Sequence, residues 1–255
     1  MQTTIQFKNQ TYQLWLDQPL DISIPLHEGT DVVNCFYAPL LETSPVIAGD
    51  FIGSTAQGGP VNFMNVRLNP HGNGTHTECV GHIAREPYSI NDNLKQFHFV
   101  AKLVSLFPQR LEDGDRVIMP EQIREVFTPG ETEAIVIRTL PNDELKLRRN
   151  YSGTNPPYLH HKAIDYLVEG GIKHLLIDLP SVDREQDDGK LRGHRAFWKY
   201  PGEVRTNCTI SELVFVDNAI KDGLYLLNLQ IASFEIDVSP SKPVLYRLTK
   251  MDLDR

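Results

Sequence analysis

The chain has 255 residues, of which 40% are hydrophobic and 23% are charged. This balance is typical of a folded globular protein and excludes a disordered chain, a collagen-like repeat or a disulfide-stapled miniprotein. The 33 acidic residues outnumber the 25 basic ones, for a formal net charge of −8, whereas nucleic-acid-binding domains are usually basic. A small molecule is therefore a more plausible partner than a nucleic acid.

The N-terminal residues 1–10 lack the basic start and apolar stretch of a secretory signal. No apolar run approaches the roughly 18 residues of a membrane helix. Cys35, Cys79 and Cys208 are odd in number and include no CxxC pair, so neither a disulfide framework nor a zinc knuckle is expected. We expect a cytoplasmic protein, with export by another route as the alternative.

Short apolar runs bounded by turn residues predict strands along the chain. These runs are 63–68, 97–107, 134–139, 174–179, 224–229 and 244–248. Apolar residues at helical spacing predict helices over 120–127 and 158–169, the second of which ends at Gly170 and Gly171. Helix, glycine pair and strand in this order are typical of an α/β unit. We expect a mixed, sheet-rich α/β fold in a single domain over residues 1–255.

A histidine-rich segment at 69–82 carries the strongest chemical signal. It contains His71, His76, Glu78 and His82, while the whole chain has nine histidines. Pro70, Gly72, Asn73 and Gly74 predict a tight, irregular turn. If the chain is extended after this turn, His76 and Glu78 project from one face, because strand side chains alternate.

Imidazole and carboxylate are donors that bind Zn²⁺, Mn²⁺ or Fe²⁺. His82 lies four residues beyond Glu78 and could reach the same pocket without binding the metal. The alternative is a polar, glycine-rich turn in which histidines cluster by chance. From spacing alone, a metal site and this structural interpretation are about equally supported.

The segment resembles the cyclase family of metal-dependent hydrolases, which includes bacterial kynurenine formamidase and isatin hydrolase. The family motif is His-x-Gly-Thr-His-x-Asp-x-Pro-x-His, and Gly74-Thr75-His76 and His82 match its centre and its last histidine. Further similarities are the segments at 21–26, 171–183, 193–194 and 210–213. The resemblance implies a swivelling β/β/α architecture.

The resemblance also implies a set of site residues. His71, His76 and Glu78 would hold one divalent ion, Zn or Mn. His194 and Glu212 would complete that site or hold a second ion, and His82 would be the catalytic proton shuttle. The implied activity is hydrolysis of a small amide, formamide or lactam, as in arylformamidases of tryptophan catabolism. A homo-oligomer, dimer or tetramer, is also implied.

Three departures from the family motif bear on the site. Asn73 is in effect inserted before Gly-Thr-His, Glu78 replaces the aspartate, and Val80 replaces the proline. The longer turn and the longer carboxylate could compensate for each other in reaching one ion. Alternatively, the site could have changed its metal or lost it.

The distant candidates also have structural interpretations. His194 lies among basic residues and could belong to a solvated loop, and Glu212 could be an N-terminal helix residue. Asp178 and Asp183 are interpreted as structural or as supporting the site. His160 and His161 are interpreted as a surface or packing pair, and His27, His98 and His174 show no partner pattern. Cys79 is interpreted as a buried bystander thiol, although it could line the pocket. Trp15 and Trp198 are interpreted as core residues, although they could cover an aromatic substrate.

Three functions remain open at this stage. The first is the metal-dependent amide hydrolase. The second is a cyclase or dehydratase on the same scaffold, with His82 and Glu78 as acid and base. The third is a non-catalytic module that binds a small molecule.

Overall fold

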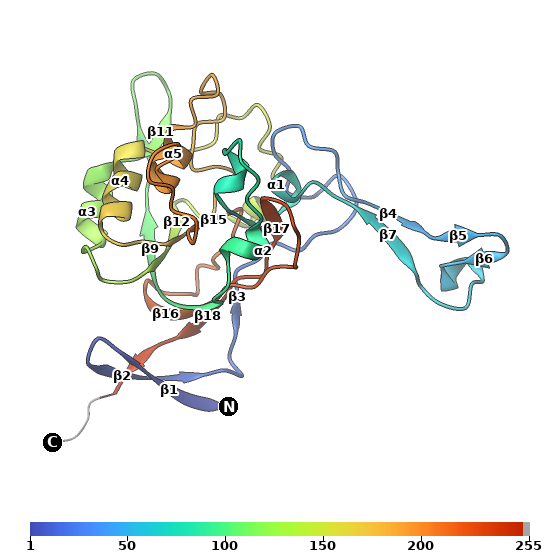
Figure 1. Cartoon of the computed structure of the whole chain (residues 1–255), viewed down its shortest axis with the longest axis horizontal. Coiled ribbons are helices and arrows are strands. Elements are labelled where there is room, and N and C mark those ends of the chain that lie inside the picture. Colours follow the sequence, from blue (N-terminus) through green and yellow to red (C-terminus); the bar gives the residue numbers. More distant parts are fainter. Residues whose placement is uncertain (252–255) are drawn as a thin grey trace.

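The computed structural model describes residues 1–251 and contains a nine-stranded sheet at its centre (Figure 1). Strands β9, β12, β14 and β15 run parallel in the middle of this sheet, and the other strands pair antiparallel at both edges. The strand order is β17 (Val238–Pro240), β8 (His76–Glu78), β15 (Thr209–Glu212), β14 (His174–Ile177), β12 (Ala134–Thr139), β9 (His98–Leu106), β16 (Gly223–Asn228), β18 (Val244–Arg247) and β3 (Leu20–Asp21).

Both faces of the parallel strands are covered. Helices α3 (Pro120–Val126), α4 (His161–Glu169) and α5 (Arg192–Trp198) lie together on one face (Figure 1), where Phe127, Leu167 and Phe197 are buried against the sheet. On the other face, the short helix α2 (Ile90–Asn93) contributes to a second apolar cluster. Every residue of β12 is buried, as expected for a central strand of a sheet covered on both sides.

Smaller elements surround this core. β1 (Gln2–Phe7), β2 (Gln10–Trp15) and β19 (Thr249–Lys250) form one small sheet, and β10 (Gln109–Arg110), β11 (Arg116–Ile118) and β13 (Tyr158–Leu159) form another. An arm projects from the body in Figure 1. It consists of the paired strands β4 (Glu42–Pro45) and β7 (Met64–Arg67), the paired strands β5 (Ile47–Ala48) and β6 (Phe51–Ile52), and the 3-10 turn η1 (Thr55–Gln57).

The mixed, sheet-rich α/β fold class is therefore confirmed, with two corrections to the predicted elements. The helix predicted over 158–169 begins only at His161, because Tyr158 and Leu159 pair with β11 as strand β13. The run at 63–68 is strand β7 of the projecting arm and takes no part in the central sheet.

A buried ion pair lies inside the fold. Lys146, in the 3-10 turn η3 (Glu144–Leu147), is buried, and its Nζ lies 2.7 Å from the buried carboxylate of Asp178. All three cysteines are free and buried. Within residues 1–251, no helix is both long and apolar enough to cross a membrane.

Candidate metal centre

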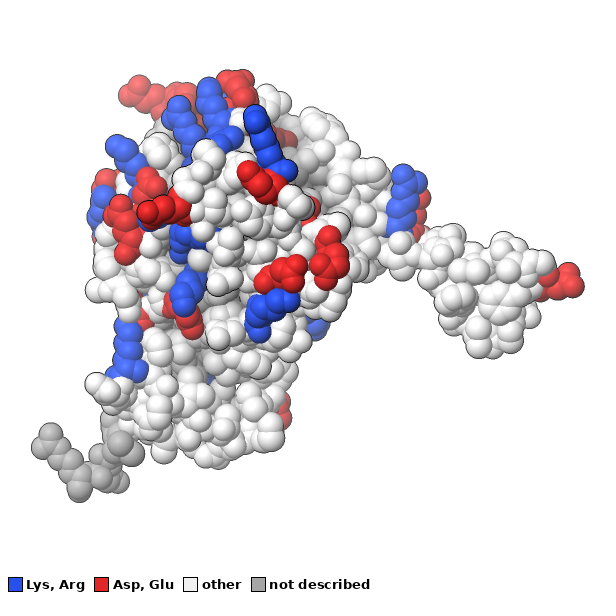
Figure 2. All heavy atoms as spheres, in the orientation of Figure 1, with Lys and Arg blue, Asp and Glu red and all other residues white. Residues whose placement is uncertain are grey.

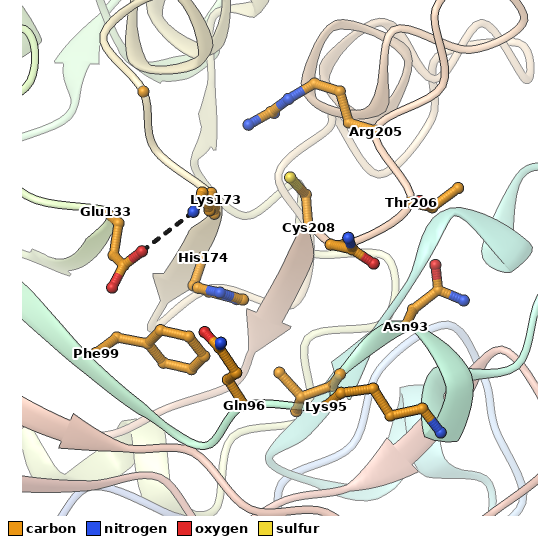
Figure 3. Close-up of a pocket in the computed structure, with 13 residues that line it drawn as sticks. Asn93, Lys95, Gln96, Phe99, Glu133, Lys173, His174, Arg205, Thr206 and Cys208 are labelled. Atoms are coloured by element: carbon orange, nitrogen blue, oxygen red, sulfur yellow. Dashed lines mark hydrogen bonds and ion pairs between the residues drawn. The ribbon is translucent and has the colours of Figure 1, made fainter.

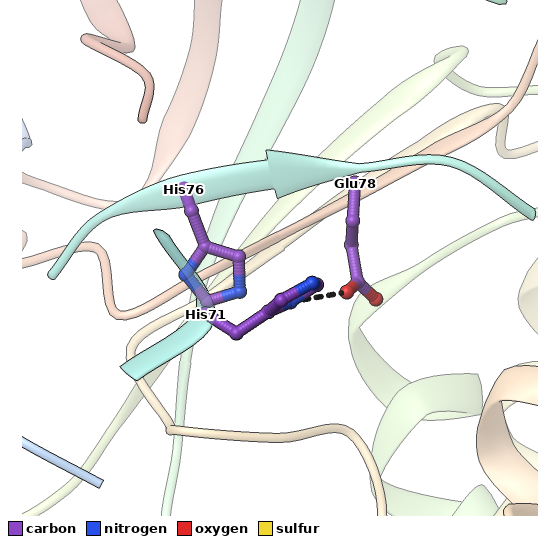
Figure 4. Close-up of side chains that lie close together, drawn as sticks. All are labelled: His71, His76 and Glu78. Carbon is purple, nitrogen blue, oxygen red and sulfur yellow. Dashed lines mark ion pairs between the residues drawn. The ribbon is translucent and has the colours of Figure 1, made fainter. Parts of the chain in front are cut away.

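Strand β8 carries two candidate ligands on one face. His76 and Glu78 project from the same side of the strand (Figure 4), as alternation in an extended chain requires. Thr77 lies between them on the opposite face, where its Oγ1 is 2.6 Å from the hydroxyl of Ser211. Because β8 pairs with β15 on one side and β17 on the other, both candidate ligands are completely or almost completely buried.

The segment before β8 is a short helix rather than an irregular turn. Helix α1 (Pro70–Asn73) starts with proline, and the Asn69 side chain accepts a hydrogen bond from Gly72 N at 3.0 Å. A Cβ at Gly72 would lie 2.2 Å from Ala38, so this position requires glycine. The helix directs His71 back toward β8, where its Nδ1 is 3.2 Å from Glu78 Oε2 (Figure 4).

The two candidates distant in the sequence, His194 and Glu212, lie beside His76 and Glu78. Glu212 ends strand β15 and lies directly across from His76 in the antiparallel register. His194 lies on helix α5 and is only 2% exposed, so the interpretation as a solvated loop residue is wrong. The interpretation of Glu212 as an N-terminal helix residue is also wrong, because it belongs to a strand.

Four buried ligand atoms at this point have no hydrogen-bond partner within residues 1–251. They are His76 Nε2, His194 Nε2 and both carboxylate oxygens of Glu78. His194 Nε2 is 3.2 Å from Glu78 Oε1, and His76 Nε2 is 3.5 Å from Glu212 Oε2. Two ligands of one tetrahedral ion, each about 2.1 Å from it, would lie roughly 3.4 Å apart. The donor set and its spacing therefore suit a divalent ion.

Both buried imidazoles are oriented by their other ring nitrogen. His76 Nδ1 donates to the carbonyl of Gly74 at 2.9 Å, and His194 Nδ1 donates to Asp183 Oδ2 at 2.6 Å. Asp183 is itself held by the backbone N–H groups of Gly193 and His194. This arrangement leaves each Nε2 lone pair directed into the site, as in carboxylate–histidine–metal sites.

Electrostatics at the centre reflect close pairing of imidazoles and carboxylates. Burial alone would raise the pKa of Glu78, but His82 and His194 hold this pKa well below its usual range. Burial alone would lower the pKa of His194, but Asp183 and Glu78 hold it well above its usual range. A divalent cation bound here would compete with the proton on His194, because an imidazole must be neutral to bind a metal.

Asp237, which no sequence motif indicated, is a further acidic residue at the centre. It immediately precedes β17, and its Oδ2 is 3.0 Å from His71 Nε2 and 3.6 Å from His82 Nδ1. Hydrogen bonds from His71 and His82 lower the pKa of Asp237, and the pKa of His71 is raised to about 10 although burial opposes this. Only the pairing of β17 with β8 brings Asp237 here, so spacing along the chain could not reveal it.

A cavity of about 520 Å³ opens onto this cluster. Its walls include His71, His82, His194 and Glu212, and the exposed Phe36 and Tyr37 lie at its edge. This volume is within the range of small-molecule sites. An aromatic side of the cavity would suit a flat, partly apolar substrate.

The remaining candidates lie outside this cluster. His160 and His161 stack on each other at 4.4 Å, and His27 and His98 are exposed. His174 is buried and lines a different cavity (Figure 3).

Three further side chains serve packing. The Trp198 ring lies 5.6 Å from the His194 ring, and its Nε1 donates to the carbonyl of Cys208 at 2.8 Å. Trp15 is half-buried on β2. Burial raises the pKa of the Cys79 thiol to about 12, so Cys79 is not an activated nucleophile.

Comparison with known proteins identifies the family of the chain. A family model described as "Putative cyclase" matches residues 20–184, more than half of the chain. The chain belongs to this cyclase family. The matched part of the cyclase domain includes His71, His76, Glu78 and His82, whereas His194 and Glu212 lie beyond it.

Individual cyclase-family relatives are similar over most of their length. A kynurenine formamidase of Bacillus cereus is 27% identical over 191 residues, which cover 74% of this chain and 82% of that protein. The isatin hydrolase A of Labrenzia aggregata aligns with a TM-score of 0.63 at 15% identity, over 90% of this chain and 93% of that one. A structure described as a potential metal-dependent hydrolase with cyclase activity aligns with a TM-score of 0.65 at 14% identity, over 90% and 97%.

Proposed function

We propose that the protein is a metal-dependent hydrolase of a small amide, formamide or lactam, with Zn or Mn as its ion. The observation that carries the proposal is the convergence of buried ligand atoms from β8, α5 and β15. Among the residues that the structure describes, His76 Nε2, His194 Nε2 and both Glu78 oxygens have no hydrogen-bond partner. The names of its relatives, kynurenine formamidase and isatin hydrolase, favour a carbonyl next to a ring nitrogen or an aryl amine as the target.

In this proposal His71, His76 and Glu78 hold one ion, since their ligand atoms lie within 4.8 Å of one another, and His194 and Glu212 complete that site or hold a second ion. A divalent ion held here supplies Lewis acidity toward both water and an amide carbonyl. Glu212 keeps its position because its Oε1 accepts a hydrogen bond from Val182 N at 2.9 Å.

His82 is the proposed proton carrier. It lies on the 3-10 turn η2 (Val80–His82), lines the cavity, and its Nδ1 is 3.6 Å from Glu78 Oε2. An imidazole at this position can accept a proton from water and donate it to the leaving nitrogen. Its exposure lets it exchange that proton with solvent between turnovers.

The test is a panel of an N-formyl aryl amine, an aryl lactam and an aryl ester, added to protein reconstituted with Zn or Mn in ¹⁸O-labelled water. We expect turnover with one labelled oxygen in the acid product. His82→Asn should lower kcat by roughly 10²–10⁴-fold while metal content is unchanged. His27→Asn, which changes an exposed histidine, is the matched control.

Other outcomes would contradict the proposal. Loss of water from the substrate would indicate a dehydratase or cyclase on the same scaffold. Small-molecule binding without turnover of any panel member, with the metal present, would indicate a binding module.

A further inference from the structure

A second cavity lies at the opposite ends of the strands that build the candidate metal centre. His174 begins β14 and Thr209 begins β15, whereas Glu212 ends β15 at the metal centre. The second cavity has a volume of about 640 Å³, larger than that of the candidate metal centre. Such a volume accommodates a small organic molecule.

The floor of this cavity is aromatic. The His174 and Phe99 rings lie with their centroids 3.8 Å apart, and both residues are almost fully buried (Figure 3). His174 Nδ1 is 2.9 Å from the hydroxyl of Thr209, which fixes the ring. Burial, followed by the charges of Lys173 and Arg205, lowers the pKa of His174 to about 3, so the ring is neutral at pH 7. A neutral, fixed pair of rings favours a flat ligand.

The walls of the cavity are cationic in a protein of net negative charge. Lys95, Lys173 and Arg205 line it (Figure 3). Both lysines have an acidic partner, since Lys95 Nζ lies 3.2 Å from Asp92 and Lys173 Nζ lies 3.3 Å from Glu133, the one acidic side chain among the lining residues. The half-buried Arg205 guanidinium donates to the backbone carbonyls of Phe197 and Ile172, lies 5.1 Å from the centre of the Phe197 ring, and forms no ion pair within residues 1–251. A half-buried cation without a counter-charge favours an anionic ligand.

We propose that this cavity is a second ligand site, which binds a small aromatic carboxylate with its ring against Phe99 and His174 and its carboxylate toward Arg205 and Lys173. The cavity and the metal centre are separate, since they share none of their lining residues. The proposal therefore does not depend on the activity of the metal centre.

Benzoate tests this site directly by isothermal titration calorimetry on the metal-loaded protein. Benzamide keeps the ring without the charge, and inorganic phosphate keeps an anion without the ring. We expect benzoate to bind at least tenfold more tightly than either, since a charge-assisted hydrogen bond contributes about 1.5–3 kcal/mol and 1.4 kcal/mol is tenfold. Equal affinity for benzoate and benzamide would overturn the proposal, and preferred phosphate binding would overturn its aromatic part.

Variants locate the bound benzoate. Lys173→Gln changes an exposed side chain and should weaken benzoate binding several-fold, as should Arg205→Gln if that variant folds. Omitting the metal from the reconstitution should leave the benzoate affinity unchanged, because the cavity and the metal centre share no lining residues. Benzoate binding that requires the metal, or wild-type affinity in Lys173→Gln, would contradict the proposed location.

Cys208 gives an independent readout of the location. It lines the cavity, and it is more exposed than Cys35 and Cys79, at 6% against 1% and 0%. Benzoate should slow alkylation of Cys208, followed by mass spectrometry, and leave the other two cysteines unaffected. An unchanged rate at Cys208 under saturating benzoate would place the ligand elsewhere.

Discussion

Each of the two buried candidate histidines is oriented by one hydrogen bond from its Nδ1 atom. Gly74 O holds His76, and Asp183 holds His194, whose ring also packs near Trp198. Asp183 thus acts on the proposed ion only through His194. This arrangement explains why a residue interpreted from the sequence as structural or supporting lies so close to the site.

At the same scale, His174 should make stability depend on pH. Its pKa is about 3 in the fold, against about 6.5 for an unperturbed histidine. Between these values the unfolded chain binds more protons, so the free energy of unfolding decreases as the pH falls, by up to about 1.4 kcal/mol per pH unit. His174→Asn should weaken this dependence in urea unfolding between pH 7 and pH 4.5. The same dependence in wild type and variant would refute the assignment, and His27→Asn is the control.

At the scale of elements, strands with strong burial on both faces could be predicted from the sequence. The run at 134–139 coincides with β12, and the run at 174–179 contains β14. A strand that is covered on both faces consists of consecutive apolar residues, so such a run in the sequence predicts a buried strand. The apolar stripe of α4 was likewise visible in the sequence.

The elements that carry the candidate site were harder to predict. β8 and β15 have three and four residues and mostly polar side chains. Strands this short and polar show no detectable hydrophobic periodicity in the sequence. Helix α5 begins Arg192-Gly193-His194-Arg195, a sequence that indicates solvent exposure. Its burial comes from packing against α4 and the sheet, a tertiary effect that local sequence does not contain. The resemblance to the cyclase family, and not local pattern, indicated His194 and Glu212.

At the scale of the whole molecule, the projecting arm exposes apolar side chains that do not pack against the body. Between Thr43 and Val66 its only charged residue is Asp50, and Figure 2 shows an arm almost free of charge. Ile47, Phe63 and Val66 are each more than half exposed. Two-stranded hairpins are marginally stable alone, and interface cores are poor in charge and use roughly 20–30 residues a side. We therefore expect the arm to pack against a second copy of the chain.

Light scattering coupled to size-exclusion chromatography tests this expectation. The wild-type protein should elute as a homo-oligomer at micromolar concentration, and the double variant Ile47→Lys, Val66→Lys should be a monomer. Leu145→Lys, at an exposed apolar residue on η3, is the matched control and should remain oligomeric. A monomeric wild-type protein, or an oligomeric double variant, would show that the arm has another role.

The most direct test of the metal centre is the metal content of protein reconstituted with Zn or Mn and then dialysed, measured by mass spectrometry of the element. The wild-type protein and the His98→Ala control should each retain at least one ion per chain. His76→Ala and His194→Ala should lose it, because each removes one of the buried nitrogens that face Glu78 and Glu212. A wild-type protein that retains no ion, or variants that retain as much as wild type, would contradict the account.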